Sequence, residues 1–184
     1  MFIQTEATPN PDSLKFIPGR IVLETGTASF NKGDDCTKSP LAKKILDVPQ
    51  ITGVFFANDF ITVTKESAAD WYALKPLVLG NIMEHFVANL PILMEGAAAP
   101  IAMADSDDPL VQQIQELIDT RVRPAVAQDG GDIIFHSFDN GVVYLKMHGA
   151  CSGCPSSTAT LKSGIENMLK YYVPEVLEVR AIEE

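Results

Sequence analysis

The sequence predicts an α+β protein built from two small domains, and three observations lead to this fold class. Strand-like runs bounded by turn residues alternate with amphipathic helix-like runs. A length of 184 residues with 46% apolar residues suits one ordinary domain or two small ones. Residues 95–108, "EGAAAPIAMADSDD", interrupt both periodicities. We therefore expect domains at residues 1–94 and 109–184, joined by an acidic flexible linker at 95–108.

The first strands are expected at the start of the chain. "FIQTEAT" and "LKFI" flank the turn "PNPDS", and "RIVLE" is a candidate for a third strand. Ser39 followed by Pro40 has the pattern of an N-cap with proline at the first helical position, which predicts a short helix over "PLAKKIL". "ITGVFFA" and "FITVTK" are joined by Asn58-Asp59, which suits a tight hairpin turn because both residue types tolerate positive φ.

A longer helix completes the first domain. Its apolar residues recur at spacings of three and four, which is typical of a helix that packs on a core. These residues are Trp71, Leu74, Val78, Ile82, Phe86 and Leu90. We expect Pro76 near the start of this helix or at a kink, because proline cannot donate the hydrogen bond that a helix interior needs.

The second domain opens with another N-cap and proline pair, Asp108-Pro109, ahead of a helix. One face of this helix is apolar and is formed by Leu110, Ile114, Leu117, Ile118 and Val122. The glycines of "DGGD" (129–132) allow the chain to reverse. Asp139-Asn140-Gly141 is a strong hairpin signal between "IIFHSF" and "VVYLKM".

A second helix and a last strand end this domain. Residues 161–172 have the apolar spacing of an amphipathic helix that ends before Pro174, and "VLEVRAI" is strand-like. The predicted order is α-β-β-α-β. We expect a small mixed sheet covered by two helices.

Composition excludes several classes of protein. A net charge of −10 without a clustered basic face disfavours nucleic-acid binding, which depends on Lys and Arg. No stretch is long and apolar enough to predict a membrane-spanning helix. The start of the chain has neither the pattern of a signal peptide nor that of a transit peptide. We expect a cytoplasmic protein, or a mitochondrial matrix protein if this is a processed mature chain.

Two cysteines lie between the hairpin and the following helix, in "GACSGCPSS". We expect Cys151 and Cys154 just before a helix N-terminus capped by Ser156 or Ser157. There, orphan N–H groups and the helix dipole favour negative charge. Both thiols should then ionise more readily than a free cysteine. The pattern indicates a site for two thiolates.

Four interpretations of this pair remain open. The cysteines can have only a packing role, or form the redox pair of a thiol–disulfide oxidoreductase, which also has strand, CxxC and helix in this order. A structural zinc site needs four ligands, and His148 and His136 would complete one with this single CxxC. An iron–sulfur cluster also takes four thiolates, which two chains related by a two-fold axis would supply.

Six motifs resemble one known family. "DGGDI", "GACSGCPSS" and "TLKSGIE" resemble the C-terminal NifU-like domain of the Nfu-type iron–sulfur cluster scaffold and carrier proteins. "MFIQTEATPNPDSLKFIPG", "DFITVTK" and "LKPLVLGNIMEHF" resemble the N-terminal domain that accompanies it. The resemblance covers nearly the whole chain except the linker.

The resemblance implies that Cys151 and Cys154 of two chains bridge one 4Fe–4S cluster in a homodimer. It implies a carrier and not an enzyme. The carrier receives clusters from upstream cluster-assembly proteins and delivers them to recipient apoproteins such as lipoyl synthase or aconitase-type enzymes. The scaffold and ferredoxin cysteines of full-length NifU are absent, so we expect delivery rather than assembly with a desulfurase. Residues 1–94 hold no candidate ligand set and are expected to recognise recipients.

Four other residues have ordinary structural interpretations. His148 precedes Cys151 by three residues and is interpreted as a polar residue at a strand end. Asp129 and Asp132 surround two turn glycines, which favours capping and turn roles. Cys36, in "NKGDDCTKSP", is interpreted as a loop cysteine without a role in the site.

Overall fold

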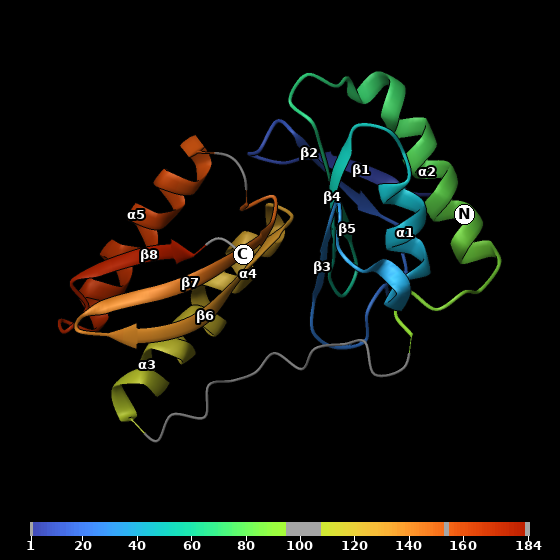
Figure 1. Cartoon of the computed structure of the whole chain (residues 1–184). Coiled ribbons are helices and arrows are strands. Elements are labelled where there is room, and N and C mark those ends of the chain that lie inside the picture. The colour runs from blue at the N-terminus through green and yellow to red at the C-terminus, as the bar shows by residue number, and fades with distance from the viewer. Residues whose placement is uncertain (1, 95–107, 153–154, 183–184) are drawn as a thin grey trace. The chain divides into compact units, whose positions relative to one another are not determined.

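The computed structural model describes residues 2–94, 108–152 and 155–182, except for the side chains of residues 155–157. The backbone divides into two compact units, Met1–Pro100 and Ile101–Glu184. Each unit combines one sheet with helices, which confirms the predicted α+β class (Figure 1). The expected linker, apart from Asp108, lies outside the described residues. Among the helices described, none has the length and apolar character needed to cross a membrane.

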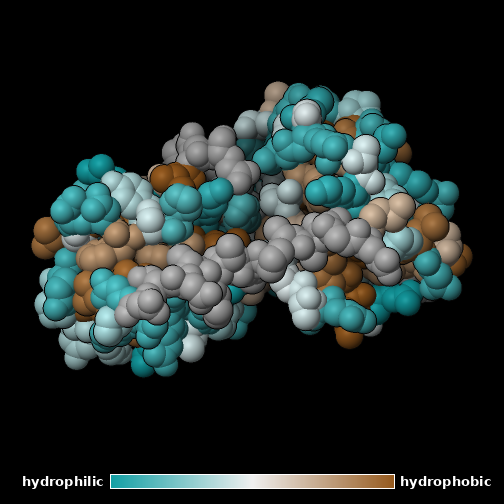
Figure 2. Space-filling view, turned by 60° about the horizontal axis from the view of Figure 1, so that its bottom comes forward, coloured by the Kyte–Doolittle hydropathy of each residue, from teal (hydrophilic) through white to brown (hydrophobic). Residues whose placement is uncertain are grey.

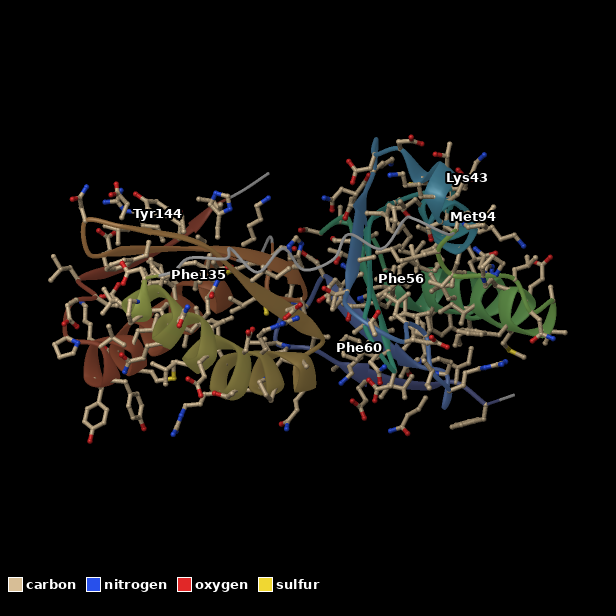
Figure 3. All side chains as sticks on the ribbon, turned by 90° about the horizontal axis from the view of Figure 1, so that it is seen from below. Lys43, Phe56, Phe60, Met94, Phe135 and Tyr144 are labelled. Atoms are coloured by element: carbon tan, nitrogen blue, oxygen red, sulfur yellow. The ribbon has the colours of Figure 1, made fainter. Side chains whose placement is uncertain are left out.

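The N-terminal unit is a five-stranded antiparallel sheet with its helices on one face (Figure 1). The strand order is β1-β2-β5-β4-β3. The strands are β1 (Gln4–Ala7), β2 (Ser13–Ile17), β3 (Ala28–Asn31), β4 (Ile51–Phe56) and β5 (Ile61–Lys65). The helices are the short 3₁₀ turn η1 (Cys36–Lys38), α1 (Pro40–Leu46) and α2 (Trp71–Val87). Phe56 of β4 lies between the sheet and the helices (Figure 3). Ile82 of α2 belongs to the same core.

Both α-helices of this unit begin where the sequence predicts. The Ser39 hydroxyl accepts a hydrogen bond from Ala42 N at 3.2 Å and donates one to the carbonyl of Ile92 at 2.7 Å. Pro40 is the first residue of α1. The Asp70 carboxylate caps α2 by accepting from Tyr72 N at 2.9 Å. These caps satisfy N–H groups that a helix start leaves without partners.

One strand predicted for this unit is wrong, and the hairpin predicted at Asn58-Asp59 forms without positive φ. "RIVLE" is no strand, although Val22 and Leu23 are buried, because both of their N–H groups donate to the carbonyl of Asn58, at 2.7 and 3.3 Å. The strand beside β4 is instead β3, at the sheet edge. Asn58 and Asp59 do connect β4 to β5, but neither has positive φ. The Asn58 side chain donates to the carbonyl of Leu23 at 2.8 Å, so this connection anchors a loop.

The C-terminal unit has the predicted order α-β-β-α-β. Its helical part starts with α3 (Pro109–Leu117), the π-helical segment η2 (Ile118–Val122) and α4 (Arg123–Gln128). The sheet follows as β6 (Gly131–Asp139), β7 (Val142–Gly149) and, after α5 (Pro155–Tyr172), β8 (Glu178–Ile182). β7 pairs antiparallel with β6 and parallel with β8, so the sheet is mixed, as predicted. Figure 3 shows the helices on one face, with Phe135 toward them and Tyr144 on the other face.

The hairpin between β6 and β7 also forms as predicted. Asn140 and Gly141 have φ values of 49° and 82°, the left-handed conformation that a tight type I′ turn requires. The ladder shifts register between Phe135 and Ser137, so β6 carries a bulge at His136.

The helix before β6 contains a turn wider than an α-helical one. The Arg123 N–H donates to the carbonyl of Ile118, five residues back, and Pro124 has no N–H to continue the α-helical pattern. The buried residues follow a spacing of four: Ile114, Ile118, Val122 and Val126. In a helix of 3.6 residues per turn this spacing drifts around the axis, and the wider turn offsets the drift. The predicted Leu110 and Leu117 are only partly buried.

His85 is a fully buried polar residue of α2. Its Nε2 lies 3.2 Å from the carbonyl oxygen of Pro91, and Nδ1 has no hydrogen-bond partner among the described residues. Burial lowers the pKa of His85 below its ordinary value of 6.5, although the hydrogen bond to Pro91 opposes this effect. The folded unit therefore holds a neutral imidazole.

We expect the N-terminal unit to lose stability as the pH falls below 6.5, and His85→Leu to remove this component. Because the folded pKa is depressed, the unfolded chain takes up the proton first, so the stabilisation is complete above the unfolded pKa and lost below it. Denaturant unfolding at about pH 5 and about pH 8 measures the effect. Trp71 is the only tryptophan in the sequence and reports on this unit. Identical pH profiles for both proteins would contradict the prediction.

Candidate metal centre

Cys151 follows β7 in a tight turn that is hydrogen-bonded at both ends. Gly149, the last residue of β7, has a φ of 64°. Ala150 N donates to the carbonyl of Gly130 at 3.1 Å, which ties the turn to the connection between α4 and β6. Ser152 donates to the carbonyl of Gly149 from its backbone N at 3.2 Å and from its hydroxyl at 2.9 Å. The position of Cys151 is therefore set by two neighbouring loops.

The Cys151 sulfur lies against Gly131. Cys151 is 5% exposed and belongs to the core of the C-terminal unit. A Cβ atom on Gly131 would overlap Cys151 Sγ and approach the carbonyl oxygen of His148 to 2.9 Å. Gly131 also pairs with Gly149 at the end of the β6–β7 ladder. The missing side chain at Gly131 is what makes room for the sulfur.

The expectation that Cys151 ionises readily is wrong for the structure described. Burial raises the pKa of the Cys151 thiol to about 12, and the charges of Asp129 and Asp132 add to the effect. The sulfur lies at the edge of the apolar core, and α5 begins only four residues later, at Pro155. A metal ion that binds Cys151 must therefore displace its proton.

Cys154, the other predicted site residue, lies outside the described residues. Its neighbourhood differs from the expectation in one respect. Because α5 begins at Pro155, Ser156 and Ser157 belong to the first helical turn, and neither is the N-cap. Proline at the first helical position is a common helix start. The Thr158 hydroxyl donates to the carbonyl of Cys151 at 3.1 Å and joins this turn to the preceding loop.

A buried ion pair holds the start of β6. Arg123 Nε donates to Asp132 Oδ1 at 2.8 Å, and Nη2 donates to Oδ2 at 2.9 Å. Nη1 of the same guanidinium donates to Asp119 at 3.2 Å. Asp132 is 4% exposed, and its carboxylate raises the pKa of Arg123. The interpretation of Asp132 as a turn residue is therefore wrong, whereas Asp129 is the exposed C-cap residue of α4.

The described residues do not by themselves form a zinc site around His136 and His148. His148 is half-buried and pairs with Asp132 in the ladder. His136 is exposed at the bulge of β6. Within residues 2–94, 108–152 and 155–182 no three His, Cys, Asp or Glu side chains are placed to hold a metal ion. A metal centre at Cys151 therefore depends on ligands from beyond this described set.

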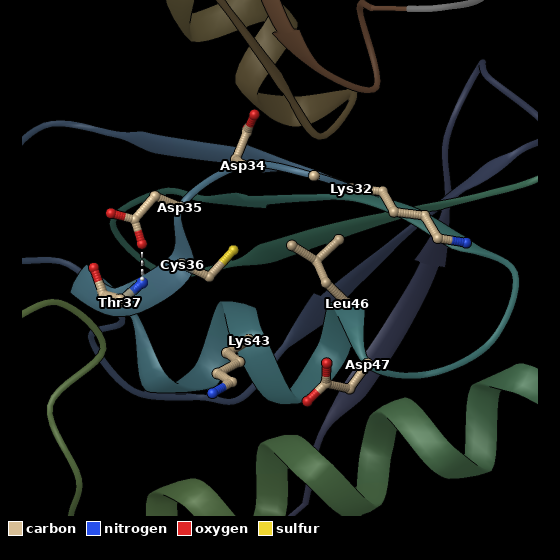
Figure 4. A pocket seen from close by; sticks show the side chains of 9 residues that line it. Lys32, Asp34, Asp35, Cys36, Thr37, Lys43, Leu46 and Asp47 are labelled. Carbon is tan, nitrogen blue, oxygen red and sulfur yellow. Dashed lines mark hydrogen bonds between the residues drawn. The ribbon is translucent and has the colours of Figure 1, made fainter.

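Cys36 lies in the other unit, at the start of η1. It borders a cavity of about 450 Å³ whose lining includes Asp34, Asp35 and Asp47 (Figure 4). Burial raises the pKa of the Cys36 thiol, and these three carboxylates raise it further. Asp35 is engaged as the cap of η1 and accepts from Thr37 N at 3.0 Å. These surroundings favour a protonated thiol.

Comparisons with known proteins match both parts of the chain. Residues 3–89 match the family model described as "Scaffold protein Nfu/NifU N terminal", and residues 114–180 match the one described as "NifU-like domain". A solution structure of a NifU-like protein from Saccharomyces cerevisiae is 22% identical, covers 52% of this chain and 86% of that one, and has a TM-score of 0.48.

Curated relatives match along nearly the whole chain. A Drosophila persimilis protein named "NFU1 iron-sulfur cluster scaffold homolog, mitochondrial" is 53% identical over 99% of this chain. The Homo sapiens protein of the same name is 49% identical over 99% of this chain. The chain spans 65% of the length of the first relative and 72% of the second.

Replacing Arg123 with Leu should destabilise the C-terminal unit, because it leaves the Asp132 carboxylate buried without its partner. Since the Arg123 side chain is 23% exposed and partly screened by water, we expect a loss of about 2 kcal/mol in the free energy of unfolding. Arg180→Leu is the matched control, since its pair with Glu178 is exposed, and it should cause no measurable loss. Denaturant unfolding followed by circular dichroism distinguishes the two variants, and equal effects would contradict the prediction.

Replacing Gly131 with Ala should displace Cys151 from its buried position. The added methyl group collides with Sγ and with the His148 carbonyl, so we expect a lower unfolding midpoint and faster alkylation of Cys151 by iodoacetamide. Gly164→Ala is the control, because that exposed glycine of α5 has nothing within 4 Å of the added atom. Mass spectrometry measures the labelling. An unchanged labelling rate in Gly131→Ala would show that the turn adapts.

Proposed function

Because this chain belongs to the Nfu family of iron–sulfur cluster scaffold proteins, we propose that it carries a 4Fe–4S cluster between two copies and delivers it to recipient apoproteins. Each copy contributes Cys151 and Cys154, and the cluster is cargo. The observation that carries the proposal is the fixed position of Cys151 in a turn between a strand and a helix, three residues before Cys154. The curated relatives are named as scaffolds, which supports the same role.

Two chains are needed because one chain supplies too few thiolates. The sequence contains three cysteines, and Cys36 lies in the other unit, among carboxylates that favour its protonated form. A cluster with four thiolate ligands is completed when two CxxC turns face each other across a two-fold axis. Separation of the two chains then removes half of the ligands together. This property suits delivery better than permanent storage.

Delivery is a ligand exchange without electron transfer. Bonds from iron to Cys151 and Cys154 of both chains break, and bonds from iron to recipient thiolates form. Each recipient thiol gives up a proton as it binds iron, and each released thiolate of the carrier takes one up. The oxidation state of the cluster does not change. The carrier therefore needs no reductant to complete the exchange.

A carrier role also fits Cys151 better than disulfide chemistry does. A thiol that attacks disulfides works best with a pKa near the ambient pH, and the Cys151 thiol is buried with a raised pKa. We therefore propose a carrier and not an enzyme. Upstream assembly proteins would load it, and residues 1–94 would recognise recipients such as lipoyl synthase or aconitase-type enzymes.

Of the two compartments expected from the sequence, the comparisons favour one. Both curated relatives are named as mitochondrial proteins. We propose the mitochondrial matrix as the place of action, in preference to the cytoplasm.

Cys151→Ser and Cys154→Ser should each abolish stable cluster binding, because each substitution removes two of the four ligands in a two-fold dimer. Anaerobic reconstitution with iron and sulfide, followed by metal analysis and sedimentation, measures cluster content and association together. The wild-type chain should sediment as a dimer when loaded, since a cluster that binds only between two chains shifts the equilibrium toward them.

Cys36→Ser is the matched control and should retain the full cluster content. Near-stoichiometric cluster in either of the other single variants would refute the shared site. A loaded wild-type protein that stays monomeric at all concentrations would refute it as well.

A further inference from the structure

The outward face of α2 is apolar except for Glu84, whose carboxylate pairs with Lys44 of α1 at 3.3 Å. The other exposed residues of this face are Tyr72, Ala73, Pro76, Leu77, Gly80, Met83, Val87 and Ala88. An exposed helix normally turns charged residues to water. Tyr72 and Val87 are 89% and 72% exposed, and Figure 2 shows hydrophobic residues at the surface of both units. Such a face marks an interaction surface.

The exposed residues of α2 are arranged symmetrically about Gly80. They lie three, four, seven and eight residues to either side of it, as the pairs Leu77 and Met83, Pro76 and Glu84, Ala73 and Val87, and Tyr72 and Ala88. In an antiparallel crossing of two copies at Gly80, Val87 would meet Ala73, and Tyr72 would meet Ala88. Nothing lies within 4 Å of the position a Gly80 Cβ would take, so a second helix can approach closely.

We propose that this face binds a second copy of the chain through an antiparallel contact between the two α2 helices, centred on Gly80. The inference rests on the proposed function, because a shared cluster would tether the two N-terminal units. We expect a contact made by one helix of each chain to be weak between separate chains, since stable interfaces bury roughly 800 Å² on each partner. Tethering through the cluster raises the effective concentration of one N-terminal unit near the other to about millimolar, at which a weak contact forms. Pairing of the N-terminal units therefore follows cluster loading.

Cross-linking of loaded protein tests the geometry. In a Cys36→Ser chain reconstituted with iron and sulfide, Gly80→Cys places one thiol per chain at the crossing point. Ala73→Cys is the matched control on the same face, because two copies of position 73 lie about 21 Å apart along antiparallel axes. A short bismaleimide should cross-link Gly80→Cys at least tenfold faster than Ala73→Cys. Adding Val87→Glu to the Gly80→Cys chain should slow its cross-linking about tenfold, since a charge then faces an apolar surface.

Each outcome separates the proposals. Equal rates for Gly80→Cys and Ala73→Cys overturn the self-association. A chain with Cys151→Ser and Cys154→Ser cannot bind the cluster, so cross-linking it at about 1 mM tests the contact without cluster sharing. Gly80→Cys should still cross-link faster than Ala73→Cys in this chain. If loaded protein sediments as a monomer, the proposed shared cluster is wrong, and this result does not bear on the contact between the α2 helices. If Val87→Glu slows transfer to an apoprotein but leaves cross-linking unchanged, the face binds recipients and the proposed self-association is wrong.

Discussion

The ion pair between Arg123 and Asp132 is the interaction on which the cysteine turn depends. It joins the helix before the sheet to the second residue of β6, and the first residue of that strand, Gly131, is the surface against which the Cys151 sulfur lies. A bidentate guanidinium–carboxylate pair fixes orientation as well as distance. Because burial of a carboxylate costs desolvation energy, the pair contributes more to a defined geometry than to net stability.

The second constraint is steric and comes from glycine. Gly131 pairs with Gly149 in the ladder, and the Cys151 sulfur occupies the space that a Gly131 side chain would take. The turn after β7 can therefore fold back onto the start of β6. Cys151 is thereby buried, and burial raises the pKa of its thiol. A metal ion that binds this sulfur must displace its proton.

Features that depend on neighbouring residues could be predicted from the sequence. The caps at Ser39 and Asp108 and the hairpin at Asn140-Gly141 formed as expected, because each depends on a few consecutive residues. The element order of the C-terminal unit followed from apolar periodicity, and the helical crossover of α5 lets β7 and β8 pair in parallel. Of the candidate site, the sequence indicates Cys151 and its place between strand and helix.

Features that depend on distant contacts could not be predicted. The segment at Val22 has strand-like composition, but its N–H group binds the carbonyl of Asn58, which lies far along the chain. Nothing near Asp132 in the sequence shows that Arg123 meets it, and the burial of Cys151 follows from that contact and from Gly131.

The π-helical segment Ile118–Val122 has a consequence for which changes in chain length the protein tolerates. An α-helix takes up one extra residue by forming a π-helical turn, so loss of one residue there would close the turn to an α-helical one and leave the residues after it facing the same way. Arg123 would then still meet Asp132, and we expect this stretch to tolerate a single deletion better than the α-helices on either side of it.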